Sequence, residues 1–236
     1  MNSTKINKEI AELCGIILGD GNLHKSCNRI TITGSINDKA YHKLVVLKLF
    51  NNNFNIRPIL FEQKHKNAHY IQIESKGIIN YFLKIGLSRG PKNGISVPKF
   101  IKNNKHLIPH FLRGLFDTDG SIKFSKQKKE INYYPRTRIS AKYSEMGVMI
   151  EYLLRKLKFN YNIWKDKRNG SHILNYEISG KHNLEKWFKI IKPSNPVHIS
   201  KFLFWKKFGY HIPSSTLNSR LKALNLNINN ISQIKA

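Results

Sequence analysis

The sequence predicts an α+β fold made of two similar halves, each with the order α-β-β-α-β-β-α. The first observation is a repeat of about 100 residues, in which LCGIILGDG (13–21) corresponds to LRGLFDTDG (112–120). The second is that segments typical of strands and helices follow both motifs in the same order. The third is the hydrophobic content, 40% of 236 residues, which is enough for a packed core.

Each repeated motif ends an apolar helix, which in the first half covers residues 10–18. Gly15 and Gly19 lie one turn apart on one face, and Gly114 and Thr118 repeat that spacing. Glycine is unfavourable inside a helix, so its presence indicates a close approach of another backbone. We therefore expect the two helices to pack tightly against each other, with their C-terminal ends adjacent.

Matching elements follow the two motifs. Polar N-caps, Asn37-Asp38 and Ser144-Glu145, open a helix in each half. Segments rich in β-branched and aromatic residues predict the strands. The expected pairs, first half before second, are strands 29–33 and 136–141, helices 39–50 and 146–158, strands that begin at 54–56 and 161–163, strands 70–74 and 175–179, and closing helices around 82–85 and 187–190.

These elements divide the chain into a first half (1–90), a linker (91–105), a second half (106–192) and a helical C-terminal extension (193–236). The region of the linker is rich in Gly, Pro, Lys and Asn. The extension contains a basic amphipathic helix at 200–208 and a helical segment at 214–226, and it has no counterpart in the first half. No apolar run approaches about 18 residues, so we expect no membrane span.

The charge balance predicts a polyanionic partner. Lys and Arg number 41 against 14 acidic residues, which gives a formal net charge of +27, and the cations are interleaved with aromatic residues along the chain. A compact protein with this imbalance repels itself unless it binds a polyanion such as nucleic acid. Two cysteines, Cys14 and Cys27, form neither a zinc pattern nor a disulfide framework. An intracellular location is expected, in a prokaryotic cytoplasm or an organelle.

Asp20 and Asp119 meet if the two motif helices pack as expected. A helix C-terminus is its negative pole, and two carboxylates about 4 Å apart repel by about 4 kcal/mol at an effective dielectric constant of about 20. Divalent cations with oxygen ligands reverse that cost and activate water in phosphodiester cleavage. The alternative is that each Asp-Gly only ends its helix in a turn, with Gly21 and Gly120 as C-caps. Two copies in register on a basic repeat protein favour the metal site.

The two motifs and their flanking elements resemble the LAGLIDADG homing endonucleases, in the single-chain form with two motifs. The resemblance covers nearly the whole chain. It implies a monomer with a pseudo-symmetric saddle of two antiparallel sheets astride double-stranded DNA, and with the helices packed behind. It also implies a site-specific endonuclease that makes a double-strand break across the minor groove and leaves short 3′ overhangs. The implied cofactor is Mg²⁺; Mn²⁺ is expected to substitute, and Ca²⁺ to bind without supporting cleavage.

The same resemblance assigns roles to residues of the chain. It places the metal-binding acids at Asp20 and Asp119, whereas Asp117 is not expected to bind metal. It implies one basic residue per half near the scissile phosphate, for which Lys92 and Lys192 are the candidates. The residues expected to order water at the end of the second strand, or to contact DNA there, are Ser35, Lys39 and Lys142, of which Lys142 is counted as catalytic. The alternative for each lysine is a surface charge that contacts phosphate.

One face of each sheet is expected in the major groove, where Arg and Lys suit guanine, Gln suits adenine and Glu suits the cytosine amino group. A shift of one residue in register would exchange the two faces. Because the halves differ at nearly all these positions, we expect a non-palindromic target. The candidates are Lys25, Asn28, Arg29, Thr31, Thr33, Gln63, Lys64, Gln72 and Glu74 in the first half, and Lys123, Ser125, Lys126, Arg136, Arg138, Ser140, Lys165, Lys167, Arg168 and Glu177 in the second.

Two other functions stay open on the same scaffold. One is an intron RNA maturase, a splicing cofactor, because high positive charge suits RNA as well as DNA. The other is a catalytically silent DNA-binding protein. The presence of both Asp20 and Asp119 favours a nuclease over either. A nuclease embedded in a self-splicing protein is disfavoured, because flanking splicing segments are not expected.

Overall fold

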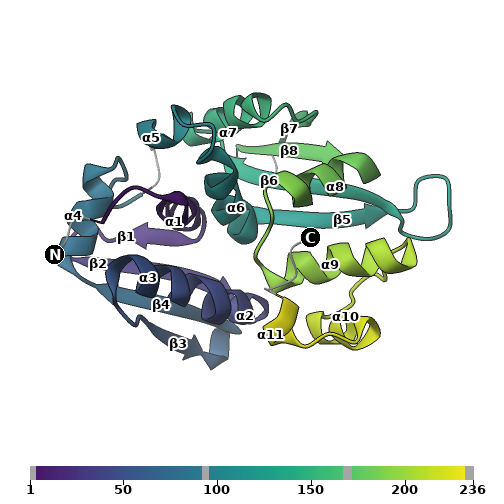
Figure 1. Cartoon of the computed structure of the whole chain (residues 1–236), viewed down its shortest axis with the longest axis horizontal. Helices are drawn as coiled ribbons and strands as arrows, with labels where there is room; N and C mark the ends of the chain where they lie inside the picture. Colours follow the sequence, from purple (N-terminus) through teal and green to yellow (C-terminus); the bar gives the residue numbers. More distant parts are fainter. Residues whose placement is uncertain (1–3, 92–95, 167–171, 232–236) are drawn as a thin grey trace.

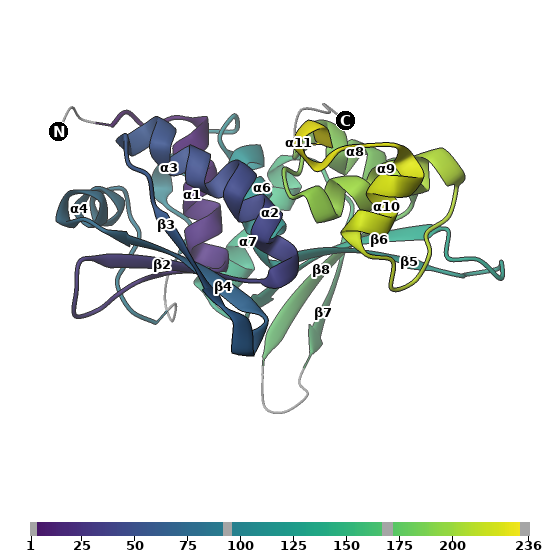
Figure 2. The ribbon, with the colours of Figure 1, turned by 90° about the horizontal axis from the view of Figure 1, so that it is seen from below.

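Two four-stranded antiparallel sheets flank a central pair of helices in the computed structural model, which describes residues 4–91, 96–166 and 172–231. The central helices are α1 (Lys8–Gly19) and α6 (Ile108–Asp119) (Figure 1). The strand orders are β1-β2-β4-β3 and β5-β6-β8-β7, so the two sheets have the same topology. Figure 2 shows most of the helices on one side of the two sheets. The expected α+β fold with two pseudo-symmetric halves is confirmed.

Each half has the same series of elements. In the first half α1 is followed by β1 (Gly21–Leu23), β2 (Arg29–Ser35), a helical stretch that includes α2 (Lys39–Tyr41) and α3 (Leu47–Phe54), β3 (Ile59–Gln63), β4 (Ala68–Glu74) and α4 (Lys76–Lys84). In the second half α6 is followed by β5 (Gly120–Ser125), β6 (Tyr134–Lys142), α7 (Glu145–Lys156), β7 (Asn162–Asp166), β8 (Ile173–Ser179) and α8 (Lys181–Ile190). A short helix, α5 (Lys99–Lys102), precedes α6.

One predicted boundary of the first half is wrong. The strand expected to begin at 54–56 begins at Ile59, because α3 continues to Phe54. Asn55 ends that helix in the left-handed conformation (φ 52°), and its N–H donates to the carbonyl of Asn51. Asparagine adopts this conformation more readily than most residues, and it therefore acts as a helix cap here.

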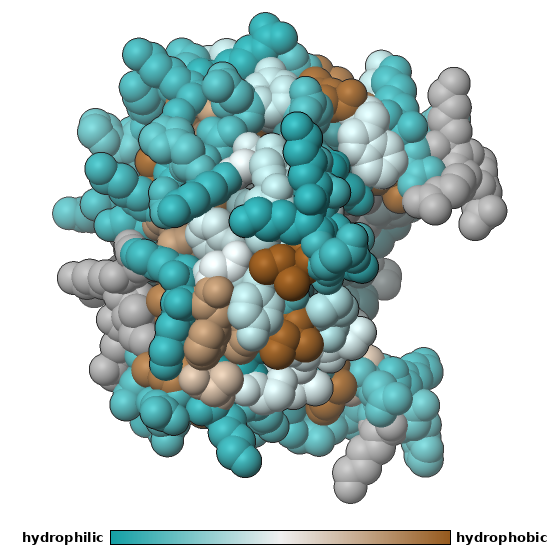
Figure 3. All heavy atoms as spheres, turned by 90° about the vertical axis from the view of Figure 1, so that its right-hand side faces the viewer, coloured by the Kyte–Doolittle hydropathy of each residue, from teal (hydrophilic) through white to brown (hydrophobic). Residues whose placement is uncertain are grey.

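In its described part, up to residue 231, the C-terminal extension forms three helices, α9 (Pro196–Phe208), α10 (Leu217–Leu224) and α11 (Ile228–Ile231). Helix α9 begins at Pro196, four residues before the expected start at residue 200. The Asn195 side chain accepts from the N–H of Val197, and Pro196 fits the first helical turn. Figure 3 shows the end of the molecule on the right of Figure 1, where hydrophilic residues predominate and hydrophobic ones gather near the middle. Within the described residues, no helix is long and apolar enough to cross a membrane.

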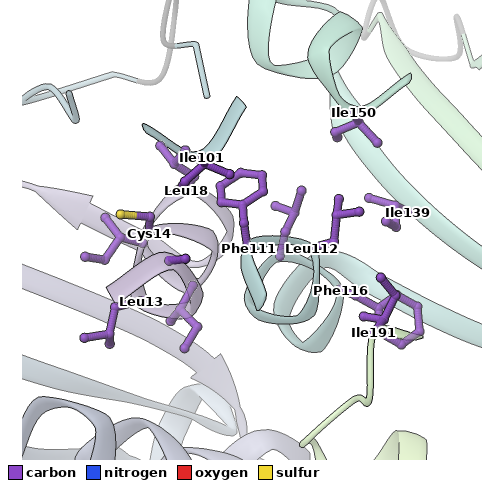
Figure 4. Packing of buried hydrophobic residues seen from close by; sticks show 14 of the residues in the cluster. Leu13, Cys14, Leu18, Ile101, Phe111, Leu112, Phe116, Ile139, Ile150 and Ile191 are labelled. Atoms are coloured by element: carbon purple, nitrogen blue, oxygen red, sulfur yellow. The ribbon is translucent and has the colours of Figure 1, made fainter. Parts of the chain in front are cut away.

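The contact between α1 and α6 is made by backbone atoms. A Cβ atom at Gly15 would collide with the carbonyl oxygen of Phe111, and one at Gly114 would collide with that of Glu12. One turn further on, Thr118 occupies the space where Gly19 lacks a side chain. The predicted face of small residues is therefore confirmed, and the helices pack in parallel. Figure 4 shows the larger side chains of α1 and α6 directed into the core around this contact.

Several histidines are buried. The Nε2 atom of His69 lies 2.7 Å from Nδ1 of His42, and both rings are inaccessible to solvent. Burial, followed by the proximity of His69, lowers the pKa of His42 to about 4. His198 packs on Phe116, and burial lowers the pKa of this histidine to about 3. His211 stacks on Phe124, and burial lowers its pKa to about 4. The folded protein therefore keeps these rings neutral.

We predict that Gly15→Ala lowers the free energy of unfolding by about 3 kcal/mol or more, because the added methyl group must separate two backbones in a close-packed core. Urea unfolding followed by circular dichroism measures the change. The control is Lys48→Ala at an exposed position of α3, for which a change within about 0.5 kcal/mol is expected. Equal stability of Gly15→Ala and the wild type would contradict the close helix contact.

The buried histidines predict a loss of stability in acid. A folded-state pKa below the unfolded value of about 6.5 means that the unfolded chain takes up protons first as the pH falls. The free energy of unfolding is therefore retained above pH 6.5 and declines between about 6.5 and 4, by about 1.4 kcal/mol per pH unit for each such histidine. His211→Phe keeps the stack on Phe124 and removes one titrating group. The variant therefore reduces the slope of the unfolding free energy against pH by up to about 1.4 kcal/mol per pH unit. An unchanged slope in this variant would refute the assignment.

Candidate catalytic and DNA-binding site

Asp20 and Asp119 end the two central helices at the junction of the halves. Asp20 caps α1, its N–H donating to the carbonyl of Ile16 at 3.0 Å, and its own carbonyl accepts from the N–H of Thr33 at 3.2 Å. Asp119 is exposed, and its Oδ2 atom lies 3.3 Å from the place that a Cβ atom of Gly19 would take. The carboxylate from the second half therefore lies beside the residue that precedes Asp20.

The glycines after the two aspartates begin strands. Gly120 has an extended conformation (φ −90°, ψ 167°), and Gly21 is the first residue of β1. Each lies so close to the preceding helix that a Cβ atom would collide with Ile17 or Phe116. Gly120 is the C-cap of α6, as the alternative predicted, whereas α1 is capped by Asp20 and Gly21 already belongs to β1. Their small size lets each chain turn at once from the motif helix into the sheet.

The two aspartates provide suitable donors for a hard divalent cation. Their oxygens lie at the negative ends of two parallel helices, and Mg²⁺, Mn²⁺ and Ca²⁺ prefer oxygen ligands. Among the described residues there is no cluster of three or more His, Cys, Asp or Glu side chains that could enclose a metal ion. A cation held here by Asp20 and Asp119 must therefore complete its coordination with water or with oxygens of a bound partner, such as phosphate.

Asp117, in contrast, points into the body of the protein. Its Oδ2 accepts from the N–H of Ser194 at 2.7 Å, and its main-chain carbonyl accepts from Nδ2 of Asn195 at 2.9 Å. Burial raises the pKa of this carboxyl group well above its usual value. Asn195 also donates to Asp38 of the first half at 3.3 Å, so Asp117 belongs to a buried contact between the halves.

The structure describes one of the two predicted basic residues. Lys92 lies outside the described residues. Lys192 is exposed and close to His110, whose pKa is lowered to about 4 by burial and then by Arg113, Lys8 and Lys192. The chain around Lys192 runs along α6, because the carbonyl of Ile191 accepts from Arg113 at 2.9 Å and the N–H of Ser194 donates to Asp117 at 2.7 Å. The role of Lys192 stays a prediction.

Lys201 occupies a position that sequence reasoning missed. In the first half the carbonyl of Leu23 accepts from the N–H of Gly90 at 2.7 Å. The equivalent carbonyl in the second half, that of Ile122, accepts from Nζ of Lys201 at 3.2 Å. The amine of Lys201 therefore donates to the second half's carbonyl in the way that the N–H of Gly90, two residues before Lys92, donates in the first half. Burial, followed by Arg220 and Lys123, lowers the pKa of Lys201. The repeat gave no signal for this lysine, because α9 has no counterpart in the first half.

The residues expected to order water lie beyond the aspartates on β2 and β6. Gly21 pairs with Ile32 and Gly120 pairs with Ile139, so Ser35 and Lys142 occupy equivalent positions three residues further on. The Ser35 hydroxyl donates to Asp38 at 2.6 Å. Lys39, the third of these candidates, begins α2, and its amine lies 2.5 Å from Glu62.

The strand register decides which candidates share the outward face of the sheets, the face opposite the buried isoleucines Ile30, Ile32, Ile71 and Ile73. Figure 2 shows this side of the sheets directed away from most of the helices. The candidates on it are Arg29, Thr31, Thr33, Ser35, Gln63, Gln72 and Glu74 in the first half and Lys123, Ser125, Arg136, Arg138, Ser140, Lys142 and Glu177 in the second. Their roles in reading bases stay predictions.

Lys165 is on the opposite face, so its assignment is wrong. It pairs with buried Leu174, and its ammonium lies 4.7 Å from the ring centre of Tyr143. Trp164, which the sequence reasoning missed, takes the outward position. The other candidates are in turns: Lys25 and Asn28 between β1 and β2, Lys64 in the turn before β4, and Lys126 after β5, with Lys167 and Arg168 outside the described residues.

The carboxylate of Glu177 is paired with two arginines. Its carboxylate accepts from Arg136 at 2.9 Å and from Arg138 at 2.8 Å, and the Ser179 hydroxyl donates to it at 3.2 Å. The residue is only 6% exposed. Glu177 therefore orients two guanidinium groups on the outward face, and a contact between Glu177 and a base stays a prediction.

Comparison with known proteins agrees with this geometry. Residues 108–192 match the model of the LAGLIDADG-like domain. The chain is 29% identical over 206 residues to the replication factor C small subunit of Methanocaldococcus jannaschii, a match that covers 83% of this chain and 11% of that protein. It is 24% identical over 175 residues to an uncharacterized protein of the same organism, covering 71% of this chain and 63% of that one. The chain therefore spans about a tenth of the first relative and less than two thirds of the second.

Solved structures share the fold of most of the chain. The meganuclease I-SmaMI bound to uncleaveable DNA has a TM-score of 0.57 at 15% identity, covering 89% of this chain and 90% of that one. The LAGLIDADG homing endonuclease I-LtrWI bound to target DNA has a TM-score of 0.56 at 11% identity, covering 94% and 97%. I-DmoI in complex with DNA and Mn has a TM-score of 0.52 at 20% identity, covering 78% and 96%, and a complex with DNA and Ca is also similar.

We predict that Ca²⁺ or Mn²⁺ raises the unfolding midpoint of the wild type, because binding to the folded state alone stabilises it. Each kcal/mol of binding free energy shifts the midpoint by roughly 2–4 °C for a chain of this size. Asp119→Asn removes this response, since it removes one of the two carboxylates. Asp117→Asn keeps it, because Asp117 contacts Ser194. Scanning fluorimetry measures all three midpoints, and a full metal response in Asp119→Asn would exclude the pair as the metal site.

Proposed function

Because residues 108–192 form a LAGLIDADG-like domain and the whole chain has the fold of the LAGLIDADG homing endonucleases, we propose that this protein is a site-specific DNA endonuclease. It makes a metal-dependent double-strand break in a long, non-palindromic target. The observation that carries the proposal is the position of the Asp119 carboxylate beside Gly19, the neighbour of Asp20. One acidic residue from each half is thereby held at the junction of two sheets, where each half can act on one DNA strand.

The two aspartates hold the cation, for which we propose Mg²⁺, with Mn²⁺ as a substitute and Ca²⁺ as an ion that supports binding alone. The DNA complexes of I-DmoI with Mn and with Ca support the use of a divalent ion. When bound, the cation supplies a more acidic water molecule and neutralises charge on the cleaved phosphate. Asp20 and Asp119 contribute its ligands from fixed helix ends, so little rearrangement is needed when DNA arrives.

Basic side chains around the carboxylates bind the phosphates on both sides of the cleaved bonds. Lys142 at the end of β6 and Lys201 beside β5 are the described candidates from the second half, and Lys92 is the candidate from the first. The lowered pKa of Lys201 reflects its burial, and a nearby phosphate would stabilise its charged form. Cleavage across the minor groove with short 3′ overhangs is part of the proposal.

The net charge of +27 supports DNA as the polyanion. Neutralising about ten phosphates would make the logarithm of the binding constant fall with the logarithm of salt concentration at a slope near −9. A single chain already contains both halves, so a monomer suffices. Intron RNA maturase activity and silent DNA binding are the alternatives, and the experiment below separates them from cleavage.

We predict that Asp20→Asn or Asp119→Asn reduces double-strand cleavage by at least about a hundredfold, since each removes a charge needed in the transition state. DNA binding changes little, because the outward faces of the sheets are intact. The assay incubates the purified protein with DNA of its own locus, joined without the intervening sequence, in Mg²⁺ or EDTA. Asp117→Asn is the matched control and keeps the activity.

Three outcomes are distinguishable. A metal-dependent break that both Asp→Asn variants lose supports the endonuclease. Tight and specific binding without any break in Mg²⁺ or Mn²⁺ rejects it in favour of a silent DNA-binding protein. Promotion of intron splicing, without a break in the joined DNA, rejects it in favour of a maturase.

A further inference from the structure

The outward face of the first sheet contains an apolar patch. On β3 the side chains of Ile59 and Phe61 are 61% and 37% exposed, although alternate positions of the neighbouring strand are buried. The ring of Phe61 stacks on that of Tyr70 on β4, with centres 5.1 Å apart and an interplanar angle of 19°. Ala68, two residues before Tyr70 on β4, points to the same outward face. Side chains of this kind are normally covered by a partner when they form one contiguous area.

This face of the first half has little net charge. On its strands, within the described residues, Arg29 is the one cation that points outward, and its guanidinium contacts Glu74 at 2.6 Å. Gln72 donates to the same carboxylate at 2.9 Å. The other outward positions of β2 include Thr31 and Thr33, whose side chains carry methyl groups.

A hollow of about 330 Å³ adjoins the patch. Its lining includes Ile56, Arg57, Pro58, Ile59 and Phe61 on one side and the polar groups of Gln72 and Glu74 on the other. It therefore offers apolar contact and one guanidinium group along one edge and hydrogen-bonding groups along the other.

The outward face of the second sheet has the opposite character. Lys123, Arg136, Arg138 and Lys142 point outward from β5 and β6. Glu177 holds one nitrogen of each arginine, and the guanidinium of Arg138 lies 4.9 Å from the ring centre of Trp164. The two guanidinium groups are thus fixed in orientation before any partner binds, which reduces the entropy lost on binding.

We propose that the first half reads thymines through their C5-methyl groups and that the second half reads guanines through the arginines held by Glu177. In the major groove, thymine is the base that presents a methyl group, and guanine is the base that presents two acceptors to a guanidinium. The target therefore has a thymine-rich portion under the first half and a guanine-containing portion under the second. This inference rests on the proposed function and specifies the substrate of the same surface.

An apolar patch on an edge strand could instead bind a second copy of this chain. The net charge of +27 opposes association of two copies. The patch is also continuous with Arg29, Gln72 and Glu74 on the face that the proposed function assigns to DNA. DNA is therefore the better partner, and self-association is an outcome of the test.

The experiment first selects bound duplexes from a randomised DNA library with the full chain in Ca²⁺. Deoxyuridine then replaces thymidine in the selected duplex, which removes only the methyl group, and 7-deazaguanine replaces guanine, which removes only the N7 acceptor. We expect deoxyuridine to weaken binding by about fourfold per contacted methyl group. We expect 7-deazaguanine to weaken it by about tenfold per contact with an arginine.

Two features of the chain assign these effects to the halves. Cys27 is exposed in the turn between β1 and β2, whereas Cys14 is buried, so an iron-chelate cleavage reagent on Cys27 marks the DNA under the first half. The deoxyuridine effect is expected on that side. Phe61→Ser abolishes it, and Phe208→Ser on α9, at a phenylalanine of similar exposure (38% against 37%), leaves it unchanged. Glu177→Gln reduces the 7-deazaguanine effect, because the arginines lose their fixed orientation.

The outcomes separate the inference from the proposed function. Selection of no sequence at all would reject the endonuclease proposal itself. A selected sequence that is insensitive to deoxyuridine on the Cys27 side would overturn the assignment of the first half and leave the endonuclease proposal standing. A doubled mass in solution that Phe61→Ser reduces to a monomer would show that the patch binds a second copy, and would also overturn it.

Discussion

The direct contact between the backbones of α1 and α6 is the constraint on which the rest of the structure depends. Gly15 and Gly114 permit it, because any side chain at either position would collide with a carbonyl oxygen of the opposite helix. The strands β1 and β5 begin immediately after these helices, so the helix contact also fixes the separation and orientation of the two sheets. The distance between the two carboxylates and the shape of the proposed DNA-binding surface therefore have one common origin.

The same contact brings several acidic groups close to the helix pair, where two of them are buried and one is exposed. Glu12 forms an ion pair with Arg113 at 3.0 Å, and burial nevertheless raises the pKa of the Glu12 carboxyl group. Asp117 is buried among the main-chain and side-chain donors of Ser194 and Asn195. Asp119 instead reaches the surface, where a cation and a phosphate are accessible. Burial thus distinguishes the structural acids from the one that is available for chemistry.

The two halves have kept the same backbone arrangement but have diverged in their side chains. The strand orders and registers are equivalent, yet one outward face carries an aromatic and aliphatic patch and the other carries oriented arginines. The extension adds a second asymmetry, since α9 brings Lys201 to a carbonyl that in the first half accepts from a main-chain N–H. A symmetric scaffold can therefore carry an asymmetric recognition surface, because the outward side chains contribute little to the core.

The sequence by itself determined the repeat, the α+β class, the tight helix pair and the faces of most strands. These follow from local periodicity and from glycines that only a close approach explains, as at Gly15 and Gly114. It failed where a distant contact decides the position. Lys165 is on the inner face, because the pairing of β7 with β8 places it opposite buried Leu174. Lys201 and the role of Glu177 could be found only in the tertiary structure, because each depends on a hydrogen bond between elements far apart in the sequence.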